Sequence, residues 1–427
     1  MSFNSSLNEA LWIRQKAIEH TDLFKNSIPL IASENLMSPL TREMVISDFN
    51  NRYAEGLPGH RYYQGNKIVD EMETRVEELI RRLFNSKQAD VRPISGTNAN
   101  QALVFALLHP GETILTPSLD SGAHISSAEF GAVGMRGCTI KNMVFNTEEM
   151  KVDVEGTRKA ILAEKPKVVL FGFSVFLFPA PIKELKETID EVGATVWYDG
   201  AHVLGLIAGK RFQDPLREGA DVISGSTHKT FPGPQHGVIV GNTDDEKWKK
   251  VRRGVFPGVI SNHHIGAMAG LGVTAAEMIE YGESYASAII ENAKTLGGEL
   301  HSRGFKVLAE KNGFTESHTL LIDVKSQGGG KQVAEVLEQN FIILNKNMIP
   351  GDTNTKAQNP SGIRIGAQEV TRIGMGKSEM SHIADLMDRA LKGKDVKEEV
   401  LQLKKNFQEI KYCYGKDRGY DFVELYK

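Results

Sequence analysis

The sequence contains very little cysteine, no large excess of either charge, and no long apolar run. Its two cysteines, Cys138 and Cys413, are too few for a disulfide framework or a metal cluster, which favours a reducing compartment and no bound metal. The formal net charge of −3 lacks the basic excess typical of nucleic-acid-binding proteins. No apolar stretch is long enough to span a membrane, and residues 1–15 do not resemble a signal peptide. We therefore expect a soluble cytoplasmic protein that binds neither nucleic acid nor membrane.

The length of the chain suits a globular protein with more than one core. A chain of 427 residues, 41% of them hydrophobic, exceeds one ordinary domain. Residues 264–302 have the periodicity of one long helix, and the sequence changes character after it. We place the domain boundary inside this helix. The prediction is an N-terminal arm and large cofactor-binding domain at residues 1–280 and a smaller C-terminal α/β domain at residues 281–427.

Short, continuous runs of Val, Ile and Leu alternate with helical patterns along much of the chain. Such runs are typical of parallel strands buried on both faces, so we expect an α/β fold with a mainly parallel sheet. The expected strands are 113–116, 139–145, 167–173, 194–198, 220–224 and 237–241, followed by 305–308, 319–324, 341–344 and 363–366. The expected helices are 7–25, 70–84, 154–165, 182–192, 264–302, 377–392 and 396–411.

Polar side chains follow three of these strands, at the edge where ligands bind in parallel sheets. They are Ser174, Asp199, His202 and the run Ser226–Lys229. An Asp and a Lys from neighbouring strands suit pyridoxal phosphate (PLP), because the Lys amine forms a Schiff base with the aldehyde and the Asp keeps the pyridine nitrogen protonated. On these residues alone, a solvated loop Asp and a surface Lys are an equally good interpretation.

Three further segments suit either a site or a simpler structural role. Ser95-Gly96-Thr97 stands where a loop becomes a helix, so it predicts a phosphate cradle at the helix N-terminus or plain N-capping. Arg364 lies within an apolar strand and needs an anion, which is either a ligand or the partner in an internal salt bridge. Ser33 and Glu34 follow a short apolar run and predict either site residues or a capping pair.

Residues 51–66, NRYAEGLPGHRYYQGN, form an unusual loop with three Tyr, two Arg and three Gly. Tyr and Arg in a glycine-rich loop suit ligand contacts, although a packed surface loop with aromatic anchors explains them too. His124 stands among small residues, which leave its ring room to lie on something flat; a structural His is the alternative.

Several segments together resemble the serine hydroxymethyltransferase family over nearly the whole chain. The matching segments are LIASEN at 30–35, RYAEGLPGHRYYQG at 52–65, SGTNAN at 95–100, YDGAHVLGLIAG at 198–209, STHKTFPGPQHG at 226–237 and SGIRIGAQEVTRIGM at 361–375. The first two of these segments and STHKT are together highly specific. The resemblance implies a PLP-dependent transferase of the aspartate-aminotransferase-like fold (fold type I), with a mainly parallel seven-stranded sheet in the large domain. It also implies a homodimer with shared active sites.

The resemblance implies roles around the cofactor. Lys229 would carry PLP as a Schiff base, Asp199 would pair with the pyridine nitrogen, and His202 would meet the phenolic oxygen. His124 would stack on the ring and act in catalysis. The other cofactor-binding residues would be Ser95, Gly96, Thr97, Ser174, Ser226 and His228, of which His228 is also a candidate catalytic residue.

On the substrate side, Arg364 would clamp the carboxylate of serine or glycine, helped by Ser33. Tyr53, Glu55 and Tyr63 would reach the site from the neighbouring subunit, Tyr53 near the cofactor and the other two near the substrate. Glu55 would handle protons at the hydroxymethyl group, and Tyr63 is a further candidate catalytic residue. The implied reaction is the reversible transfer of the hydroxymethyl group of serine to a tetrahydropterin co-substrate, which yields glycine.

Three segments depart from the commoner bacterial pattern of the family and resemble an archaeal-type branch. FPGVISN at 256–262 replaces a glycine-rich loop, so Ser261 or Asn262 would supply phosphate contacts by side chain. Gln235 stands where Arg is common, and AHISS at 123–127 changes the pterin region. Tetrahydrofolate and tetrahydromethanopterin are both open as acceptors. A pterin-independent PLP aldolase is the alternative function, ahead of an aminotransferase or a non-catalytic PLP binder.

Overall fold

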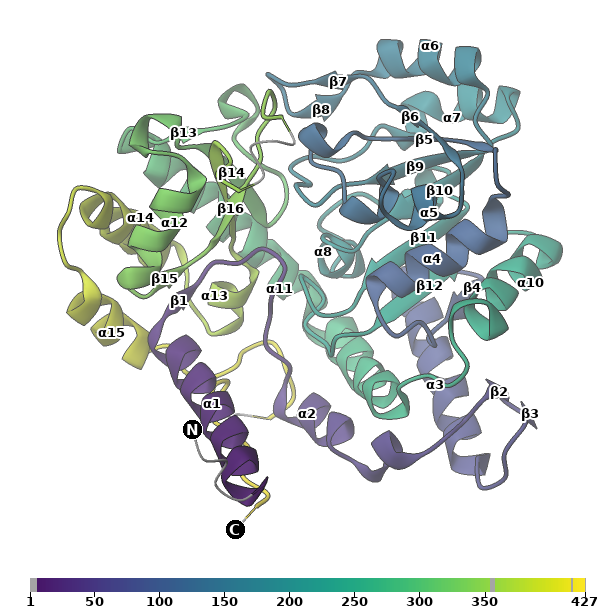
Figure 1. Ribbon diagram of the computed structural model, residues 1–427, viewed down its shortest axis with the longest axis horizontal. Coiled ribbons are helices and arrows are strands. Elements are labelled where there is room, and N and C mark those ends of the chain that lie inside the picture. The colour runs from purple at the N-terminus through teal and green to yellow at the C-terminus, as the bar shows by residue number, and fades with distance from the viewer. Residues whose placement is uncertain (1–5, 354–357, 416–417, 427) are drawn as a thin grey trace.

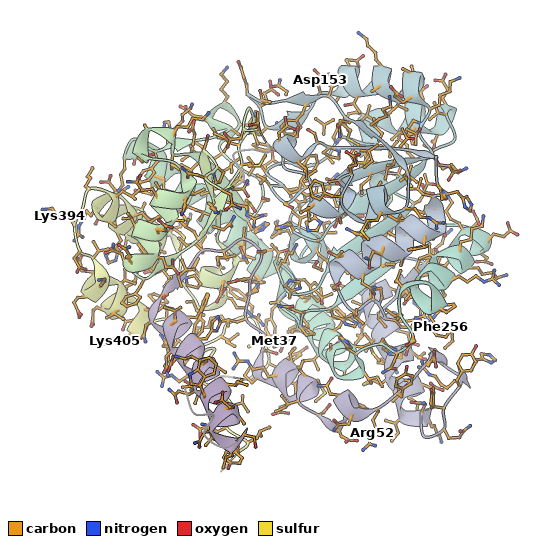
Figure 2. All side chains as sticks on the ribbon, viewed as in Figure 1. Met37, Arg52, Asp153, Phe256, Lys394 and Lys405 are labelled. Carbon is orange, nitrogen blue, oxygen red and sulfur yellow. The ribbon has the colours of Figure 1, made fainter. Side chains whose placement is uncertain are left out.

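The computed structural model describes residues 6–353, 358–415 and 418–426. Figure 1 shows two lobes side by side, one built on a seven-stranded sheet and the other on a four-stranded sheet, with the long helix α11 running between them. Side chains fill the space between the ribbons of both lobes (Figure 2). Among the residues described, no helix has both the length and the apolar composition to cross a membrane.

The seven-stranded sheet is the centre of the larger lobe. Its order is β4 (Gln88–Asp90), β12 (Gly237–Gly241), β11 (Val222–Ser226), β10 (Thr195–Asp199), β9 (Val168–Gly172), β5 (Thr113–Thr116) and β6 (Thr139–Asn142). Strand β12 is antiparallel to both of its neighbours, and the other neighbouring pairs in this sheet are parallel. The expected α/β fold with a mainly parallel sheet is therefore confirmed.

Helices cover both faces of this sheet. Trp197 of β10 lies in an apolar cluster with residues of α4 (Gly96–Leu107) and α10 (Asp245–Arg253), whereas its neighbour Tyr198 lies in the cluster that includes α3 (Lys67–Phe84). Because both faces are covered, every residue of β9, β10, β11 and β12 is buried, which explains the continuous apolar runs. The remaining helices of this lobe are α2 (Pro39–Val45), α5 (Ala132–Met135), α6 (Val154–Glu164), α7 (Ile182–Glu191), α8 (Leu204–Ala208) and α9 (Pro215–Glu218).

The smaller lobe contains an antiparallel sheet in the order β13 (Lys306–Val307), β14 (Thr319–Asp323), β17 (Gly362–Gly366) and β16 (Asn345–Asn347). Its apolar core also includes residues of α12 (Gly330–Gln339), α13 (Gln368–Arg372), α14 (Lys377–Leu391) and α15 (Lys397–Lys405). Strand β17 carries Arg364 at its centre, paired with Leu321 of β14 and Asn345 of β16.

Helix α11 (Ile265–Ser302) contributes to the cores of both lobes. Its first part places Met268, Leu271 and Ile289 in the cluster of the large lobe. Its last part places Leu296 and Leu300 in the cluster of the small lobe. The chain therefore passes from one core to the other inside a single helix.

Helix α1 (Ser6–Asn26) lies at the surface and reaches the core of the small lobe through Phe24. None of its residues is buried, and Trp12 and Ile13 are 60% and 64% exposed. The carboxyl-terminal segment runs beside it, through ion pairs of Lys25 with Asp421 and of Arg14 with Glu424. Figure 1 accordingly shows both chain ends at the same corner of the molecule.

Many expected elements differ from the observed ones at their ends, and three show an informative difference in extent or in pairing. The strand expected at 139–145 stops at Asn142, because the Val144 N–H bonds to Thr157 Oγ1 rather than to a strand. The strand expected at 341–344 is β15 (Ile342–Ile343), which pairs with β1 (Ile28–Pro29) outside the small sheet. The helix expected at 396–411 ends at Lys405, and the Gln408 side chain then bonds to the Lys25 carbonyl of α1.

The remaining elements are short. Strands β7 (Phe145–Asn146) and β8 (Lys151–Val152) form one hairpin, and β2 (Gly56–Leu57) and β3 (His60–Arg61) form another. Short 3-10 turns occupy residues 48–51, 119–121, 125–127, 310–312 and 325–327, and residues 254–259 form an irregular helical turn.

Candidate active site

The carboxyl ends of three neighbouring strands meet at one edge of the large sheet, as the sequence predicts. Asp199, the last residue of β10, is paired with Gly172 of β9 on one side and with Ser224 of β11 on the other. A Cβ atom on Gly172 would lie 2.7 Å from the Cβ of Asp199, so only glycine leaves room for the Asp side chain there. The sheet pairing thus fixes the backbone position from which the Asp199 side chain extends.

The Asp199 carboxylate is buried and accepts hydrogen bonds on both oxygens. Asn100 Nδ2 donates to Oδ2 at 2.7 Å, and the Ala201 N–H donates to Oδ1 at 3.0 Å. Asn100 is itself held by Ser126 and Ser224. These two donors fix the position of the carboxylate. Asn100 was not predicted as a site residue, although it lies within the SGTNAN segment.

Lys229 follows β11 and is 8% exposed. Burial lowers the pKa of its amine to about 8; the Asp199 carboxylate opposes this shift and the Arg364 guanidinium adds to it. Lys229 forms no ion pair within the described part of the chain. A lowered pKa raises the fraction of neutral amine at neutral pH, and the neutral amine is the nucleophile that attacks an aldehyde.

Histidine side chains surround Lys229, and burial keeps them neutral. Burial lowers the pKa of His124 and of His202, and it lowers the pKa of His228 to about 4. His124 Nδ1 lies 2.8 Å from Ser126 Oγ. The Nδ1 atoms of His202 and His228 are buried and have no hydrogen-bond partner among the described residues. Buried, unsatisfied ring nitrogens indicate that a polar ligand completes the cluster.

The N-terminus of helix α4 lies against the end of β11. A Cβ atom on Gly96 would fall 2.0 Å from Ser226 Oγ, so glycine is required for this close approach. Ser95 caps the helix, because its Oγ accepts the Asn98 N–H at 3.0 Å. The capping interpretation of Ser95 is therefore confirmed, and Thr97 stays exposed on the first turn. The helix N-terminus and Ser226 together offer donors to an anion.

Arg364 brings a buried cation from the small lobe into this cluster. It is 9% exposed; its Nε donates to Asn345 Oδ1 at 3.1 Å and its Nη1 to the Ser174 carbonyl at 2.9 Å. Both acceptors are neutral, and no carboxylate pairs with Arg364 in the described residues, so the internal salt bridge is wrong. Burial lowers its pKa to about 10, which leaves it charged at neutral pH. A buried guanidinium without a carboxylate is a binding site for one.

Residues 30–36 connect the two lobes beside this cluster. The Gly366 N–H at the end of β17 donates to the Leu30 carbonyl, which puts Ser33 near the Arg364 strand. Asn35 Nδ2 donates to the Lys229 carbonyl at 2.6 Å and to the Tyr285 hydroxyl at 2.9 Å. Helix α2 is capped by Ser38, so a capping pair of Ser33 and Glu34 is wrong.

The loop 51–66 and the 256–262 segment pack on each other. The Tyr53 hydroxyl lies 3.1 Å from Ser261 Oγ, and the side-chain Oδ1 of Asn262 accepts the Ala54 N–H at 2.8 Å. The ring centroids of Tyr53 and Tyr63 are 4.8 Å apart. Figure 1 shows the β2–β3 hairpin at the outer edge of the large lobe, away from α8, which follows Asp199 closely in the chain. The structure therefore groups Tyr53, Tyr63, Ser261 and Asn262 with each other, and not with Lys229.

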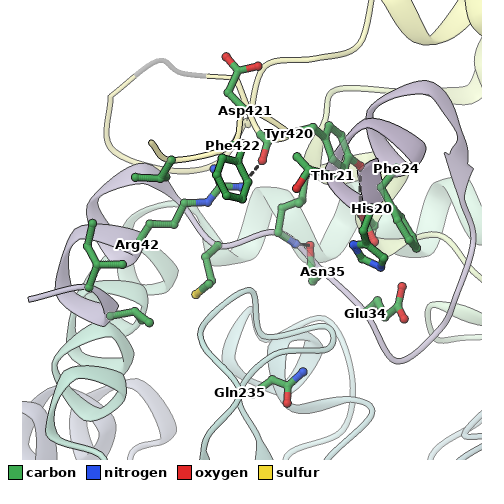
Figure 3. A pocket seen from close by; sticks show the side chains of 17 residues that line it. His20, Thr21, Phe24, Glu34, Asn35, Arg42, Gln235, Tyr420, Asp421 and Phe422 are labelled. Atoms are coloured by element: carbon green, nitrogen blue, oxygen red, sulfur yellow. Dashed lines mark hydrogen bonds between the residues drawn. The ribbon is translucent and has the colours of Figure 1, made fainter. Parts of the chain in front are cut away.

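A separate cavity of about 450 Å³ lies between α1, the 34–46 segment and the carboxyl-terminal segment (Figure 3). Its wall includes Glu34, Gln235 and Tyr420, whose hydroxyl donates to the buried Glu369 at 2.8 Å. Lys229, Asp199 and Arg364 do not line it. Gln235, the replacement for a common Arg, therefore belongs to this cavity and not to the cluster around Lys229.

Comparisons with known proteins identify relatives along almost the full chain. The family model described as serine hydroxymethyltransferase matches residues 13–387. A serine hydroxymethyltransferase of Thermoplasma volcanium is 62% identical over 98% of this chain and 99% of its own length. Those of Archaeoglobus fulgidus and Methanopyrus kandleri are 52% and 47% identical, each over 95% of this chain and over 93% and 95% of their own lengths.

Proposed function

The chain belongs to the serine hydroxymethyltransferase family, and we propose that it reversibly transfers the hydroxymethyl group of serine to a reduced pterin, leaving glycine. One observation carries this proposal: the buried guanidinium of Arg364 has only neutral partners in the described chain, and its charge helps to lower the pKa of the buried amine of Lys229. An amino acid supplies the missing carboxylate to Arg364 and holds its reacting carbon near Lys229.

The residues of the buried cluster fit PLP as the cofactor. When bound through Lys229, PLP takes up the electrons of the broken Cα–Cβ bond of serine. Asp199 would pair with the pyridine nitrogen of the cofactor, and His124 would lie against its ring. The Nδ1 atoms of His202 and His228, which have no hydrogen-bond partner in the described chain, would form hydrogen bonds with polar groups of the cofactor. The residues proposed to line the phosphate or its surroundings are Ser95, Gly96, Thr97, Ser226 and His228, and Ser174 is a further proposed cofactor-binding residue.

Substrate binding uses both lobes. We propose that residues 1–280 and 281–427 act as two domains, so that Arg364 of the second faces Lys229 of the first. Arg364 binds the carboxylate of serine or glycine as a bidentate partner, and Ser33 adds a hydroxyl beside it. Fixing the carboxylate and the amine together orients the Cα–Cβ bond for cleavage.

The remaining catalytic groups come from a second copy of the chain in a homodimer. Tyr53 and Tyr63 are 43% and 48% exposed, and they lie on a loop that bonds to no residue of the Lys229 cluster in the described chain. The exposed apolar residues of α1 support a second copy too. In the dimer, Glu55 and Tyr63 act at the hydroxymethyl group. Tyr53, braced by Ser261 and Asn262, approaches the phosphate.

Glycine release from serine, measured with tetrahydrofolate, with tetrahydromethanopterin and with no pterin, tests this function. We expect PLP-dependent glycine formation that requires one of the two pterins. No glycine with either pterin would refute the proposal. Equal cleavage of β-hydroxy amino acids with and without pterin would favour the pterin-independent aldolase instead.

A further inference from the structure

A series of hydrogen bonds joins Asp199 to His124, the two side chains that we propose contact the cofactor ring. Asn100 Nδ2 donates to Asp199 Oδ2 at 2.7 Å and to Ser126 Oγ at 3.0 Å. Ser126 Oγ in turn lies 2.8 Å from His124 Nδ1. Asn100 and Ser126 are 3% and 6% exposed, and neither has a role in the function proposed above. A buried amide and a buried hydroxyl therefore link Asp199 to His124.

The direction of these hydrogen bonds follows from a group that can only donate. The indole Nε1–H of Trp197 donates to Ser224 Oγ at 2.9 Å, and an indole nitrogen cannot accept a hydrogen bond. In the described residues, the other partner of Ser224 Oγ is Asn100 Oδ1 at 2.7 Å, so the Ser224 hydroxyl proton goes to that oxygen. The oxygen of the Asn100 amide therefore faces Ser224, and its NH2 group faces Ser126.

The same argument places the proton on the His124 ring. Ser126 Oγ accepts the Asn100 N–H, and its own proton has one remaining acceptor in the described chain, His124 Nδ1. The backbone N–H of Ser126 donates to the same Nδ1 at 3.2 Å. A ring nitrogen that accepts two hydrogen bonds carries no proton. Because burial also lowers the pKa of His124, the ring is neutral and its proton is on Nε2.

The protonated nitrogen of His124 is the one that remains available to a ligand. Nε2 forms no hydrogen bond with another residue in the part of the chain that the structure describes, whereas Nδ1 is occupied. Besides burial, three charged groups act on the pKa of this ring: Asp199 raises it, and Lys229 and Arg364 lower it. His124 therefore presents an N–H group within the buried cluster.

We propose that four positioning residues fix His124 as the Nε2–H tautomer, so that the ring offers a bound substrate a hydrogen-bond donor and not a base. The four residues are Trp197, Ser224, Asn100 and Ser126. A protonated Nε2 can donate to a substrate oxygen but cannot accept a proton from it. The use of this donor rests on the proposed function, whereas the tautomer does not.

NMR of the PLP-loaded protein with ¹⁵N-labelled histidine tests the tautomer directly. Correlations between the ring nitrogens and the ring C–H protons distinguish protonated from unprotonated nitrogens, and Nδ1 from Nε2. The signals of His124 are those that disappear in His124→Gln. We expect an unprotonated Nδ1 and a protonated Nε2 at neutral pH. A proton on Nδ1, or comparable amounts of both tautomers, would overturn the proposal.

Ser126→Ala and Ser127→Ala form a matched pair, because the two serines are neighbours and are 6% and 5% exposed. Ser126 Oγ contacts the His124 ring, whereas Ser127 Oγ donates to the His124 backbone carbonyl at 2.8 Å. Ser126→Ala should move the Nδ1 signal toward that of a ring nitrogen without a hydrogen bond, and Ser127→Ala should leave it in place. Trp197→Phe should cause a smaller change in the same direction, because it acts through two intervening side chains. A change in Ser126→Ala no larger than that in Ser127→Ala would refute the role of these residues.

His124→Gln and His124→Glu test the donor role, since the two replacements have equal length but only Gln carries N–H donors. Glycine formation by His124→Gln should exceed that by His124→Glu by about tenfold, the worth of one hydrogen bond. Equal rates, or the reverse order, would refute the donor role. The expected tautomer in a protein that forms no glycine would refute the proposed function and keep the tautomer. A proton on Nδ1 in a protein that forms glycine would do the opposite.

Discussion

The cluster around Lys229 and the 51–66 loop are built in opposite ways. Asp199, His202, Lys229 and Arg364 are at most 9% exposed, and hydrogen bonds from their own chain hold Asp199 and Arg364 in place. Tyr53 and Tyr63 are also proposed site residues, but they lie on a loop, and almost half of each residue is exposed. In the described chain, the bonds of this loop run to Ser261, Asn262 and α3, and none runs to the cluster.

We propose that this difference separates the groups that one chain organises by itself from the groups that a second copy adds. The cluster is organised before any ligand binds, because burial and fixed hydrogen bonds set the protonation of its groups. The loop is braced at its base but presents its aromatic residues outward. The 51–66 loop can therefore contribute to an active site only if it packs against the surface of another copy of the chain. The predictions below test the two regions separately, from the largest effect to the smallest.

Lys229→Ala should abolish the reaction of the cluster while keeping the fold. The variant loses the amine that we propose binds the cofactor covalently, so turnover should fall to background. The visible absorbance of the purified protein reports whether the cofactor is bound through an amine. Its circular dichroism reports whether the fold is kept. If the variant kept both the visible absorbance of bound PLP and full turnover, an amine other than Lys229 would be the one that binds the cofactor.

Arg364→Ala should weaken serine binding most strongly among the substrate contacts. Removing one side of a buried charge pair costs about 2–5 kcal/mol, which corresponds to a KM for serine raised by at least about 30-fold. Arg364→Lys should rescue little, because an ammonium cannot bind a carboxylate through two parallel hydrogen bonds. An unaltered KM in Arg364→Ala would remove the substrate carboxylate from this position.

The pH dependence of cofactor uptake should report the environment of Lys229. Since the pKa of this amine is lowered to about 8, the rate at which apoprotein takes up PLP should rise with pH and level off above about 8. The Asp199 carboxylate raises this pKa, so Asp199→Asn should move the midpoint to lower pH. A midpoint near the ordinary pKa of an exposed lysine would contradict the buried position.

Asn262→Ala should have a smaller effect than the changes in the Lys229 cluster, because it acts on the exposed loop. It removes the acceptor of the Ala54 N–H and a donor to the Arg52 carbonyl, which should cost about 1–2 kcal/mol of unfolding free energy. Urea unfolding measures the change. Ser261→Ala, which removes one hydroxyl contact to Tyr53, should cost less. Equal losses in both variants would mean that Asn262 does not brace the loop as described.

The sequence predicted the parts of the fold that depend on local patterns. Buried strands gave continuous apolar runs, so the ends of β9, β10 and β11, and with them Asp199 and Lys229, could be located. The N-terminus of α4 could be placed because Ser95 and the small residues after it form a capping signal. The closeness of Gly96 to Ser226 could not, since it depends on how α4 packs against β11.

Contacts between segments that are far apart in the sequence could not be predicted from local sequence patterns. Asn35 and the Lys229 carbonyl are 194 residues apart, and Arg364 and Ser174 are 190 apart. The choice between a ligand and a salt bridge for Arg364 required the structure, because only the fold shows that its partners, Asn345 and the Ser174 carbonyl, are neutral. The end of α15 was also misjudged, because the turn after Lys405 is set by the packing of Gln408 on α1.

The central claim is that the Lys229 cluster of one copy and the Glu55 loop of another form one site, and subunit complementation tests it most directly. Lys229→Ala and Glu55→Ala, each of which should be inactive alone, are unfolded together, refolded as a mixture and separated by different affinity tags. Random pairing should give hybrids with one intact site, and activity of about one quarter of the original protein in the unseparated mixture. Verified hybrids that are as inactive as the two parents would contradict the shared site.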